Sequence, residues 1–413
     1  PDRLGSRSRQ PLPGEPFTRG IPVIQFEEIS DEQRAMVDAV GRLLSGLRNR
    51  PAAAESADAP GKSPAELLQE VMSGELAPHL GLLLSTSGSG LPIKTDALRL
   101  LALHGGSEAD VTAGIGLPTT MVTRNPAKYG LTAMGLAAIS SGKDGSALLM
   151  NKYLPELIKG RTFCYCITEP GAGTNTHKIS TRAVEMDDHF VLNGQKTFIS
   201  AADETHYMVV IARIVSGGEQ QGVGTFVVEA ATEGISMTPL DIAVLGDRQF
   251  SVYFDNVRVP KDGLVGEKRA RTGGGIPQSV FYTLNLERLM IALINLMVCR
   301  EALAKAVRRA RQPRSSGLPV GSQQQIKIRL AKAKLKFELA SLATKRATEE
   351  YDKKGAPQLA GMYANMAKLV ATEAAVEACD VALAVYGVEG LNKQCDSGPL
   401  YQIARVVQVA PII

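Results

Sequence analysis

Phe163-Cys-Tyr-Cys-Ile-Thr-Glu-Pro-Gly-Ala-Gly-Thr-Asn175 is the most informative stretch of this chain. Its aromatic and β-branched residues predict a β-strand that ends near Thr168, and the Pro-Gly-Ala-Gly run then predicts a tight turn. Glycine adopts backbone conformations closed to other residues, so such a turn lets backbone N–H groups come close to a ligand. The hydroxyl groups of Thr168 and Thr174 border the turn. This pattern indicates a strand that leads into a candidate ligand-binding loop.

The chain is long enough for several domains. Its 413 residues exceed what one hydrophobic core usually holds, and 44% of them are hydrophobic. The net charge of +4 is small and the basic residues are dispersed, which argues against nucleic acid as a partner. No apolar run reaches the roughly 18 residues that a membrane span needs. The cysteines form no CxxC pair and have no histidine at ligand spacing, which favours reduced thiols in a cytoplasmic protein and no metal site.

The hydrophobic pattern changes twice along the chain and predicts an α+β protein. Residues 1–25 predict an N-terminal arm, and 26–160 a helical domain that opens with a capped helix at Ser30-Asp-Glu-Gln33. Short β-branched runs over 161–272 predict a β-barrel or sandwich domain. Helical spacing returns over 273–413, in blocks at 279–311, 322–354, 356–386 and 397–409, and predicts a C-terminal four-helix bundle.

Two further motifs follow the turn in order. They are Leu192-Asn-Gly-Gln-Lys-Thr-Phe-Ile-Ser200 and Phe254-Asp-Asn-Val-Arg-Val-Pro260. Together with Thr168-Glu-Pro, they resemble the acyl-CoA dehydrogenase family in order, content and spacing. The resemblance covers residues 30–410 and is strongest over 161–300. It implies a helical domain, a β domain and a four-helix bundle, the same order that the periodicity predicts.

The resemblance implies FAD as the cofactor. Thr168 would hydrogen-bond the pyrimidine edge of the flavin, Phe198 would cover one ring face in place of the usual Trp, and Ser200 matches the Thr that bonds the N5 side. Hydride transfer needs a flat cofactor that is shielded on one face and held by donors aimed at the atoms that gain charge. Taken singly, these residues also suit ordinary strand positions. The residues assigned to the flavin of the same subunit are Tyr165, Ile167, Thr168, Gly173, Thr174, Phe198 and Ser200.

Other positions would serve the FAD of a neighbouring subunit. Gln324 and Gly387 match the family there. Residues that depart from the family pattern are Pro313, Ser316, Ala384 and Gln402. These departures contrast with the intact strand for the chain's own flavin, and they suggest a non-identical partner or FAD that is held less tightly. Long helices without a wide polar face must bury apolar surface against a neighbour, so we expect a dimer or tetramer that assembles through the bundle, with identical or non-identical partners.

Leu284-Asn-Leu-Glu287-Arg-Leu289 matches the Leu-x-x-Glu-Arg-Leu that carries the catalytic base in isovaleryl-CoA and long-chain members of the family. Acyl-CoA dehydrogenation needs a carboxylate that takes an α-proton while the β-hydrogen leaves as hydride. The commoner location of this base, near the C-terminus, falls at Pro411 and holds no carboxylate. The resemblance therefore implies Glu287 as the base; the alternative is a Glu on the polar face of the helix. The expected substrate-binding residues are Asn285, Arg288 and Arg248; the alternatives are a structural ion pair for Arg288 and a solvent-exposed turn for Arg248.

The motifs together predict FAD-dependent α,β-dehydrogenation of an acyl thioester, bound to CoA or to a carrier protein, in lipid metabolism. The resemblance also implies an electron-accepting flavoprotein as partner. Two alternatives are a non-catalytic or half-site subunit of a hetero-oligomeric acyl-CoA dehydrogenase, and a flavin-dependent oxygenase on the same fold. Glu287 favours the dehydrogenase over both. Acyl chain length and branching are not predicted, because the resemblance is weak over 51–150, where the substrate-lining helices fall.

Overall fold

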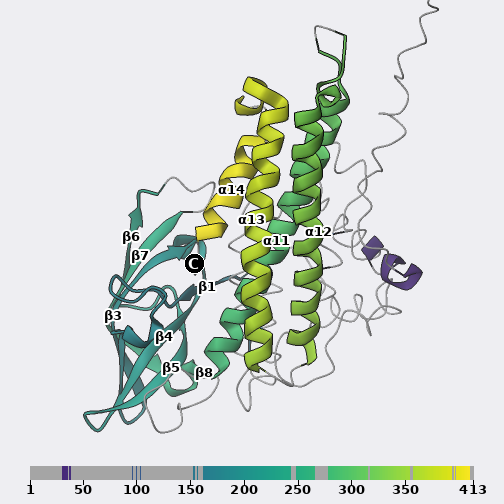
Figure 1. Cartoon of the computed structure of the whole chain (residues 1–413). Coiled ribbons are helices and arrows are strands. Elements are labelled where there is room, and N and C mark those ends of the chain that lie inside the picture. The colour runs from purple at the N-terminus through teal and green to yellow at the C-terminus, as the bar shows by residue number, and fades with distance from the viewer. Residues whose placement is uncertain are drawn as a thin grey trace, which may run out of the picture.

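A computed structural model describes residues 30–35, 37–38, 95, 99, 103, 152–153, 156, 161–242, 248–265, 278–314, 317–353, 357–392, 395 and 397–409. In this part of the chain, a β domain lies beside a bundle of long helices (Figure 1). The arm predicted at 1–25, most of the helical domain predicted at 26–160, and the positions Ser316 and Pro411 lie outside the described residues.

The β domain is built on one mixed, eight-stranded sheet, in the order β6-β7-β3-β2-β4-β5-β8 with β1 also paired to β4. Apolar side chains alternate along the strands, and those on one face form a core that includes Leu192, Phe226 and Val252. The strands are β1 Phe163–Cys166, β2 Arg182–Glu185, β3 His189–Ser200, β4 Tyr207–Ser216, β5 Glu219–Glu229, β6 Ile235–Leu240, β7 Gln249–Pro260 and β8 Leu264–Val265.

One edge of β4 is shared by two strands. β1 pairs in parallel with its first half, where Phe163 lies opposite Tyr207. β2 pairs in parallel with its second half, where Arg182 lies opposite Arg213. The chain between β1 and β2 therefore leaves the sheet and returns to it. This excursion contains the predicted glycine turn, followed by the 3-10 turn η4 (Thr176–Lys178).

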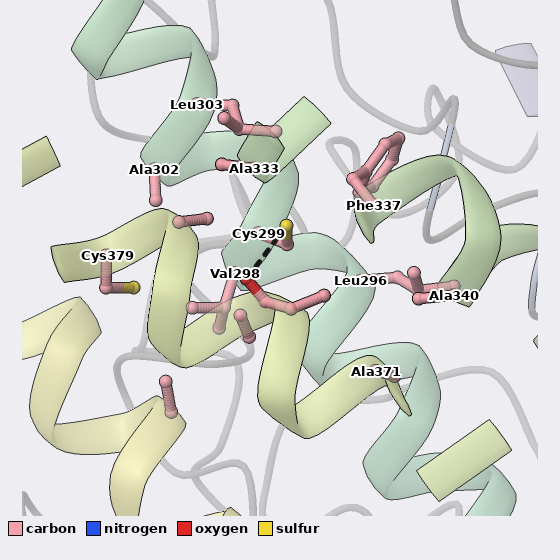
Figure 2. Close-up of a cluster of buried hydrophobic side chains, with 14 of the residues drawn as sticks. Leu296, Val298, Cys299, Ala302, Leu303, Ala333, Phe337, Ala340, Ala371 and Cys379 are labelled. Carbon is pink, nitrogen blue, oxygen red and sulfur yellow. Dashed lines mark hydrogen bonds between the residues drawn. The ribbon is translucent and has the colours of Figure 1, made fainter. Parts of the chain in front are cut away.

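The helices α11 (Gln278–Arg311), α12 (Gln324–Lys353), α13 (Pro357–Tyr386) and α14 (Ser397–Val409) lie close to the four predicted helical blocks. Small residues line the faces where these helices meet, so the backbones approach closely. Figure 2 shows this packing around Cys299 of α11, with Ala302 and Ala371 nearby. The Cys299 thiol donates to the carbonyl of Ala374 on α13 at 3.6 Å.

Short described pieces of the N-terminal half confirm one prediction and show two contacts to the bundle. Ser30 N–H donates to Gln33 Oε1 (3.0 Å) and Gln33 N–H donates to Ser30 Oγ (3.1 Å), which is the predicted capping box. The Thr95 hydroxyl bonds Asp352 of α12, and Arg300 of α11 bonds the carbonyl of Leu103. Among the described helices, none combines the length and apolar character that crossing a bilayer requires.

A separate apolar cluster joins the sheet to α11. It contains Phe163 and Tyr165 of β1 together with Val280 and Leu284 from the first turns of α11. The outward face of β1 therefore packs against the N-terminal part of this helix. That contact places the glycine turn, which follows β1, at the same junction.

Candidate active site

The predicted flavin strand and the predicted base meet at the contact between β1 and α11. Tyr165 and Ile167 pack in the same cluster as Leu284. Glu287 follows Leu284 by three residues and so lies on the same face of the helix. Burial, and then the charge of Glu287, raise the pKa of Tyr165 above its usual range. The Tyr165 hydroxyl is buried and finds no hydrogen-bond partner among the described residues.

Glu287 is half-buried and therefore not a residue of an exposed polar helix face. No hydrogen bond or ion pair joins its carboxylate to another residue in the described part of the chain. Burial raises the pKa of Glu287 to about 7, although the nearby charges of Arg288 and Lys368 act to lower it. The carboxylate can thus exchange a proton near neutral pH, which is the property that a general base needs.

Arg288 and Lys368 place positive charge beside this carboxylate. Arg288 donates through Nη1 to Asn285 Oδ1 at 3.0 Å. Asn285 is buried against α13, where a Cβ added at Gly361 would lie 3.1 Å from its Nδ2 atom. Lys368 of α13 is buried, and its ammonium group donates to the carbonyl of Gln408 at 2.8 Å. The last turn of α14 is therefore tied to the same cluster.

Glu169, at the start of the turn after β1, carries a buried carboxylate. Its oxygens accept hydrogen bonds from the backbone N–H and the hydroxyl of both Ser180 and Thr181. Lys196 of β3 forms an ion pair with Glu169 at 2.8 Å and also donates to the carbonyl of Ile167. The pKa of Glu169 is lowered to about 2; burial opposes the shift, and the charge and hydrogen bonds of Lys196 and the two hydroxyls outweigh it.

A β-bulge in β3 turns Phe198 away from the sheet. The pairing of β3 with β7 shifts between Lys196 and Ile199, and Phe198 adopts a φ of 57°. This left-handed conformation is unfavourable for a bulky residue. It leaves the ring 59% exposed. Thr197 N–H donates to the carbonyl of Thr168 at 2.9 Å, which fixes the bulge beside the turn.

The hydroxyl groups of Ser200, Thr168 and Thr174 differ in their hydrogen-bond partners. Ser200 Oγ accepts a hydrogen bond from Gln249 Nε2 at 2.6 Å. The hydroxyls of Thr168 and Thr174 make no hydrogen bond to a described residue. The backbone N–H groups of Gly173, Thr174 and Asn175 likewise have no acceptor within the described part of the chain. The turn thus presents unpaired donors at its surface.

Two predicted positions lie away from this junction. Gln324 is exposed at the start of α12, and Gly387, with a φ of 67°, is exposed in the 3-10 turn η8 (Gly387–Leu391). Gly387 lies near the end of α11, because Arg309 pairs with Glu389 of η8 at 3.3 Å. The segment before Gln324 also returns to this end, where Val320 N–H donates to the carbonyl of Gln312 at 3.3 Å. Arg311, where α11 ends, is about 36 Å along the helix from Glu287.

Arg248 is also exposed, and it pairs with Asp203 and Glu204 in the 3-10 turn η5 (Ala202–Glu204) that follows the bulged end of β3. The departures Pro313, Ala384 and Gln402 are all exposed.

Sequence reasoning missed three residues that support the site. Glu169 and Lys196 stand inside two of the quoted motifs, and charged residues at the end of an expected strand or within one are a signal for a buried ion pair. Lys368 lies among apolar residues of α13 and gave a similar, weaker signal. Their partners are far away in the sequence, so the pairings themselves were not readable.

Comparison with known proteins decides the family. Residues 164–257 match the acyl-CoA dehydrogenase middle domain, and residues 273–413 match the acyl-CoA dehydrogenase C-terminal domain. The chain belongs to the acyl-CoA dehydrogenase family. Acyl-CoA dehydrogenase FadE12 of Mycobacterium tuberculosis is 35% identical over 268 residues, which are 63% of this chain and 66% of that protein. The chain thus matches just under two thirds of the length of FadE12.

Two other proteins extend the comparison. The caffeyl-CoA reductase-Etf complex subunit CarC of Acetobacterium woodii is 29% identical over 289 residues, 68% of this chain and 74% of that protein. A glutaryl-CoA dehydrogenase from Mycobacterium smegmatis, solved in complex with FADH2, shares the fold with a TM-score of 0.68 at 18% identity, over 93% of this chain and 92% of that one. Acyl-CoA dehydrogenases are flavoprotein oxidoreductases that bind FAD.

The residues of this chain fit such a cofactor. A Cβ added at Gly171 or Gly173 would meet nothing within 4 Å, so the protein's own packing does not require glycine there. Close approach of a ligand to the backbone would explain both glycines. The unpaired N–H groups of the turn suit an anionic pyrophosphate. The exposed ring of Phe198 suits a flat apolar partner.

Proposed function

We propose that this acyl-CoA dehydrogenase binds FAD at the junction of β1 and α11 and converts an acyl thioester to its α,β-unsaturated form. The observation that carries the proposal is the state of Glu287. Its carboxylate is half-buried, has no hydrogen-bond partner among the described residues, and has a pKa raised to about 7. A carboxylate kept this basic beside the predicted flavin strand is suited to take a weakly acidic α-proton.

Glu287 accepts the proton as the α C–H bond breaks, and the electron pair of that bond forms the new double bond while the β-hydrogen leaves with its own pair. FAD, when bound, supplies the two-electron acceptor for that hydride. Arg288 and Lys368 limit the rise of the Glu287 pKa, so a large fraction of the base is ionised at neutral pH. Arg288 is further assigned, with Asn285, to orient the substrate.

The β domain would hold the cofactor. The hydroxyls of Thr168 and Ser200 would bond the flavin ring, Phe198 would shield one face, and Thr174 with the N–H groups of the turn would bind the pyrophosphate. The free hydroxyls of Thr168 and Thr174 and the exposure of Phe198 support these roles. Tyr165 and Ile167 would pack beside the ring, and Arg248 is assigned to the outer part of the substrate because it is exposed at the adjacent turn.

We also propose an oligomer that assembles through the bundle, because α12 exposes a row of apolar side chains at intervals of a helical stripe. These residues are Ile328, Leu335, Leu339 and Leu342. Gln324 and Gly387 follow the end of α11 that is remote from Glu287, so the flavin of a second chain would use them. The partner is identical or a related acyl-CoA dehydrogenase.

The remaining assignments follow the family. An electron-accepting flavoprotein would reoxidise the cofactor, as the name of CarC, an Etf complex subunit, suggests. The thioester carrier is CoA or a carrier protein. A cytoplasmic setting suits the five free cysteines of the described residues.

Rapid mixing of FAD-loaded protein with a panel of acyl thioesters, without oxygen, tests the proposal. Glu287→Gln keeps the shape of the side chain but removes the proton acceptor, so flavin bleaching should slow roughly 100-fold or more while thioester affinity changes little. Glu219→Gln, an exposed change at the start of β5, is the matched control and should bleach at the parent rate.

Equal bleaching of Glu287→Gln and parent would place the base elsewhere. A parent protein that binds FAD but is reduced by no thioester would support a non-catalytic or half-site subunit. Insertion of an oxygen atom from O2 into an added organic substrate by the chemically reduced protein, with no α,β-unsaturated thioester formed, would support the oxygenase.

A further inference from the structure

Arg213 occupies the point on β4 where β1 ends and β2 begins. Its backbone N–H donates to the carbonyl of Thr181 at 2.8 Å, just before β2 starts. The side chain is half-buried and reaches the segment that has left the sheet. No role was predicted for this arginine from the sequence, because it lies far from the glycine turn along the chain. In the fold it lies beside the segment that follows the turn.

The guanidinium group binds the turn through two backbone carbonyls. Nη2 donates to the carbonyl of His177 at 2.5 Å, and Nε donates to the carbonyl of Ile179. These carbonyls lie at the C-terminal side of η4, where a short helix leaves acceptors without internal partners. A planar guanidinium can bond both at once in a fixed geometry, which a lysine cannot do. A third contact, from Nη1 to Gln220 Oε1 of β5 at 3.4 Å, braces the group from the sheet.

The segment between β1 and β2 is therefore fixed at two places. Glu169 holds Ser180 and Thr181, and Arg213 holds His177 and Ile179. The unpaired N–H groups of Gly173, Thr174 and Asn175 lie just before His177, the first residue that Arg213 holds. Because η4 contains only three residues, its own hydrogen bonds cannot hold this shape alone.

We propose that Arg213 is a positioning residue that keeps the 174–180 segment in the form that binds the pyrophosphate of FAD. This inference rests on the proposed binding of FAD at the turn. Arg213 acts through the carbonyls of His177 and Ile179 and needs no contact with the cofactor. Its positive charge at the base of the turn further favours an anionic ligand.

Arg213→Met tests the proposal, with Gln220→Ala as the matched control because that change removes only the bracing contact. Hydrogen exchange of the FAD-free protein should show faster exchange at the amides of Thr176, Lys178 and Ile179 in Arg213→Met, with β5 unchanged. FAD affinity should fall about 10-fold or more, whereas riboflavin, which lacks the pyrophosphate, should bind as it does to the parent. Arg213→Lys, which keeps the charge, should recover only part of the FAD affinity.

Unchanged exchange in the segment would overturn the proposal, and so would equal weakening of FAD and riboflavin, which would point to general damage to the β domain. Thermal unfolding of the FAD-free variant separates such damage from a local effect. A parent chain that bound no flavin would refute the FAD assignment and with it the effect of Arg213 on affinity. The exchange data would still show whether Arg213 holds the turn.

Discussion

Glu287 is a residue whose proposed role costs stability. A carboxyl group with a pKa of about 7 in the folded protein, against an ordinary 4.5, binds more protons in the folded state than in the unfolded state between these values. The free energy of unfolding therefore falls as pH rises from 4.5 to 7. The cost is complete above pH 7 and amounts to about 3 kcal/mol.

This cost predicts that Glu287→Gln stabilises the protein at pH 8 and leaves its stability nearly unchanged at pH 4.5. Urea unfolding of FAD-free protein at the two pH values measures the difference, which should reach up to about 3 kcal/mol at pH 8. The same difference in unfolding free energy between variant and parent at both pH values would show that Glu287 does not carry a raised pKa. In the parent protein, flavin reduction should also quicken as pH rises through about 7, because only the ionised carboxylate accepts a proton.

Glu169 and Lys196 form a fully buried pair, so removal of one partner leaves the other charge uncompensated. Lys196→Met should lower the free energy of unfolding by about 3–5 kcal/mol at pH 7. The double variant Glu169→Gln with Lys196→Met should recover part of this loss, since no buried charge remains. Denaturant unfolding of parent, single and double variants checks the coupling, and additive losses would contradict it.

The same pair predicts sensitivity to acid. The folded-state pKa of Glu169, about 2, lies below the ordinary 4.5, so its contribution is present above pH 4.5 and is lost as pH falls toward 2. A variant without the pair, the double change at Glu169 and Lys196, should show a shallower loss of stability over this range. An acid titration of the unfolding free energy would reveal equal slopes if the pair were not responsible.

At the scale of the element, the bulge in β3 concentrates strain where the ligand is expected. Phe198 holds a left-handed backbone that costs roughly 1–2 kcal/mol for an L-residue and is easier for Asn. Phe198→Asn should therefore raise the unfolding free energy of the FAD-free protein by about 1 kcal/mol, while FAD dissociates roughly 10-fold faster.

Tyr253→Asn on β7 is the matched control, because Tyr253 is an exposed aromatic without a positive φ. That change should leave FAD dissociation as it is and should not stabilise the protein. Thermal unfolding and flavin fluorescence report the two effects separately. Loss of stability in Phe198→Asn would mean that the bulge is not strained in the FAD-free protein.

At the scale of the whole molecule, the exposed stripe on α12 predicts assembly. Leu335→Glu with Leu339→Glu places charge at the centre of the stripe and should convert the oligomer to smaller species, with a loss of FAD occupancy if a second chain completes the site. Leu335→Met with Leu339→Met keeps the surface apolar and should assemble as the parent does. Light scattering that finds the parent monomeric at micromolar concentration would refute assembly.

Much of the local structure, and the family, follow from the order of residues along the chain. Periodicity predicted α11 to α14 and the strands, since helix and strand spacing are written directly into the order of apolar residues. The capping box at Ser30 and Gln33 was also readable, because its partners are three residues apart. Motif order placed Thr168, Ser200 and Glu287 in the family pattern.

Which residues from distant parts of the sequence act together depends on the fold. The pKa of Glu287 depends on burial between β1 and α11 and on the charge of Lys368, and neither is a property of its neighbours in sequence. Lys196 reaches Glu169 because β3 runs beside the turn, where Thr197 N–H bonds the carbonyl of Thr168. Arg213 reaches His177 because β1 and β2 share one edge of β4. Burial and electrostatic fields depend on distance in space, so the order of residues fixes the elements while the fold fixes the chemistry between them.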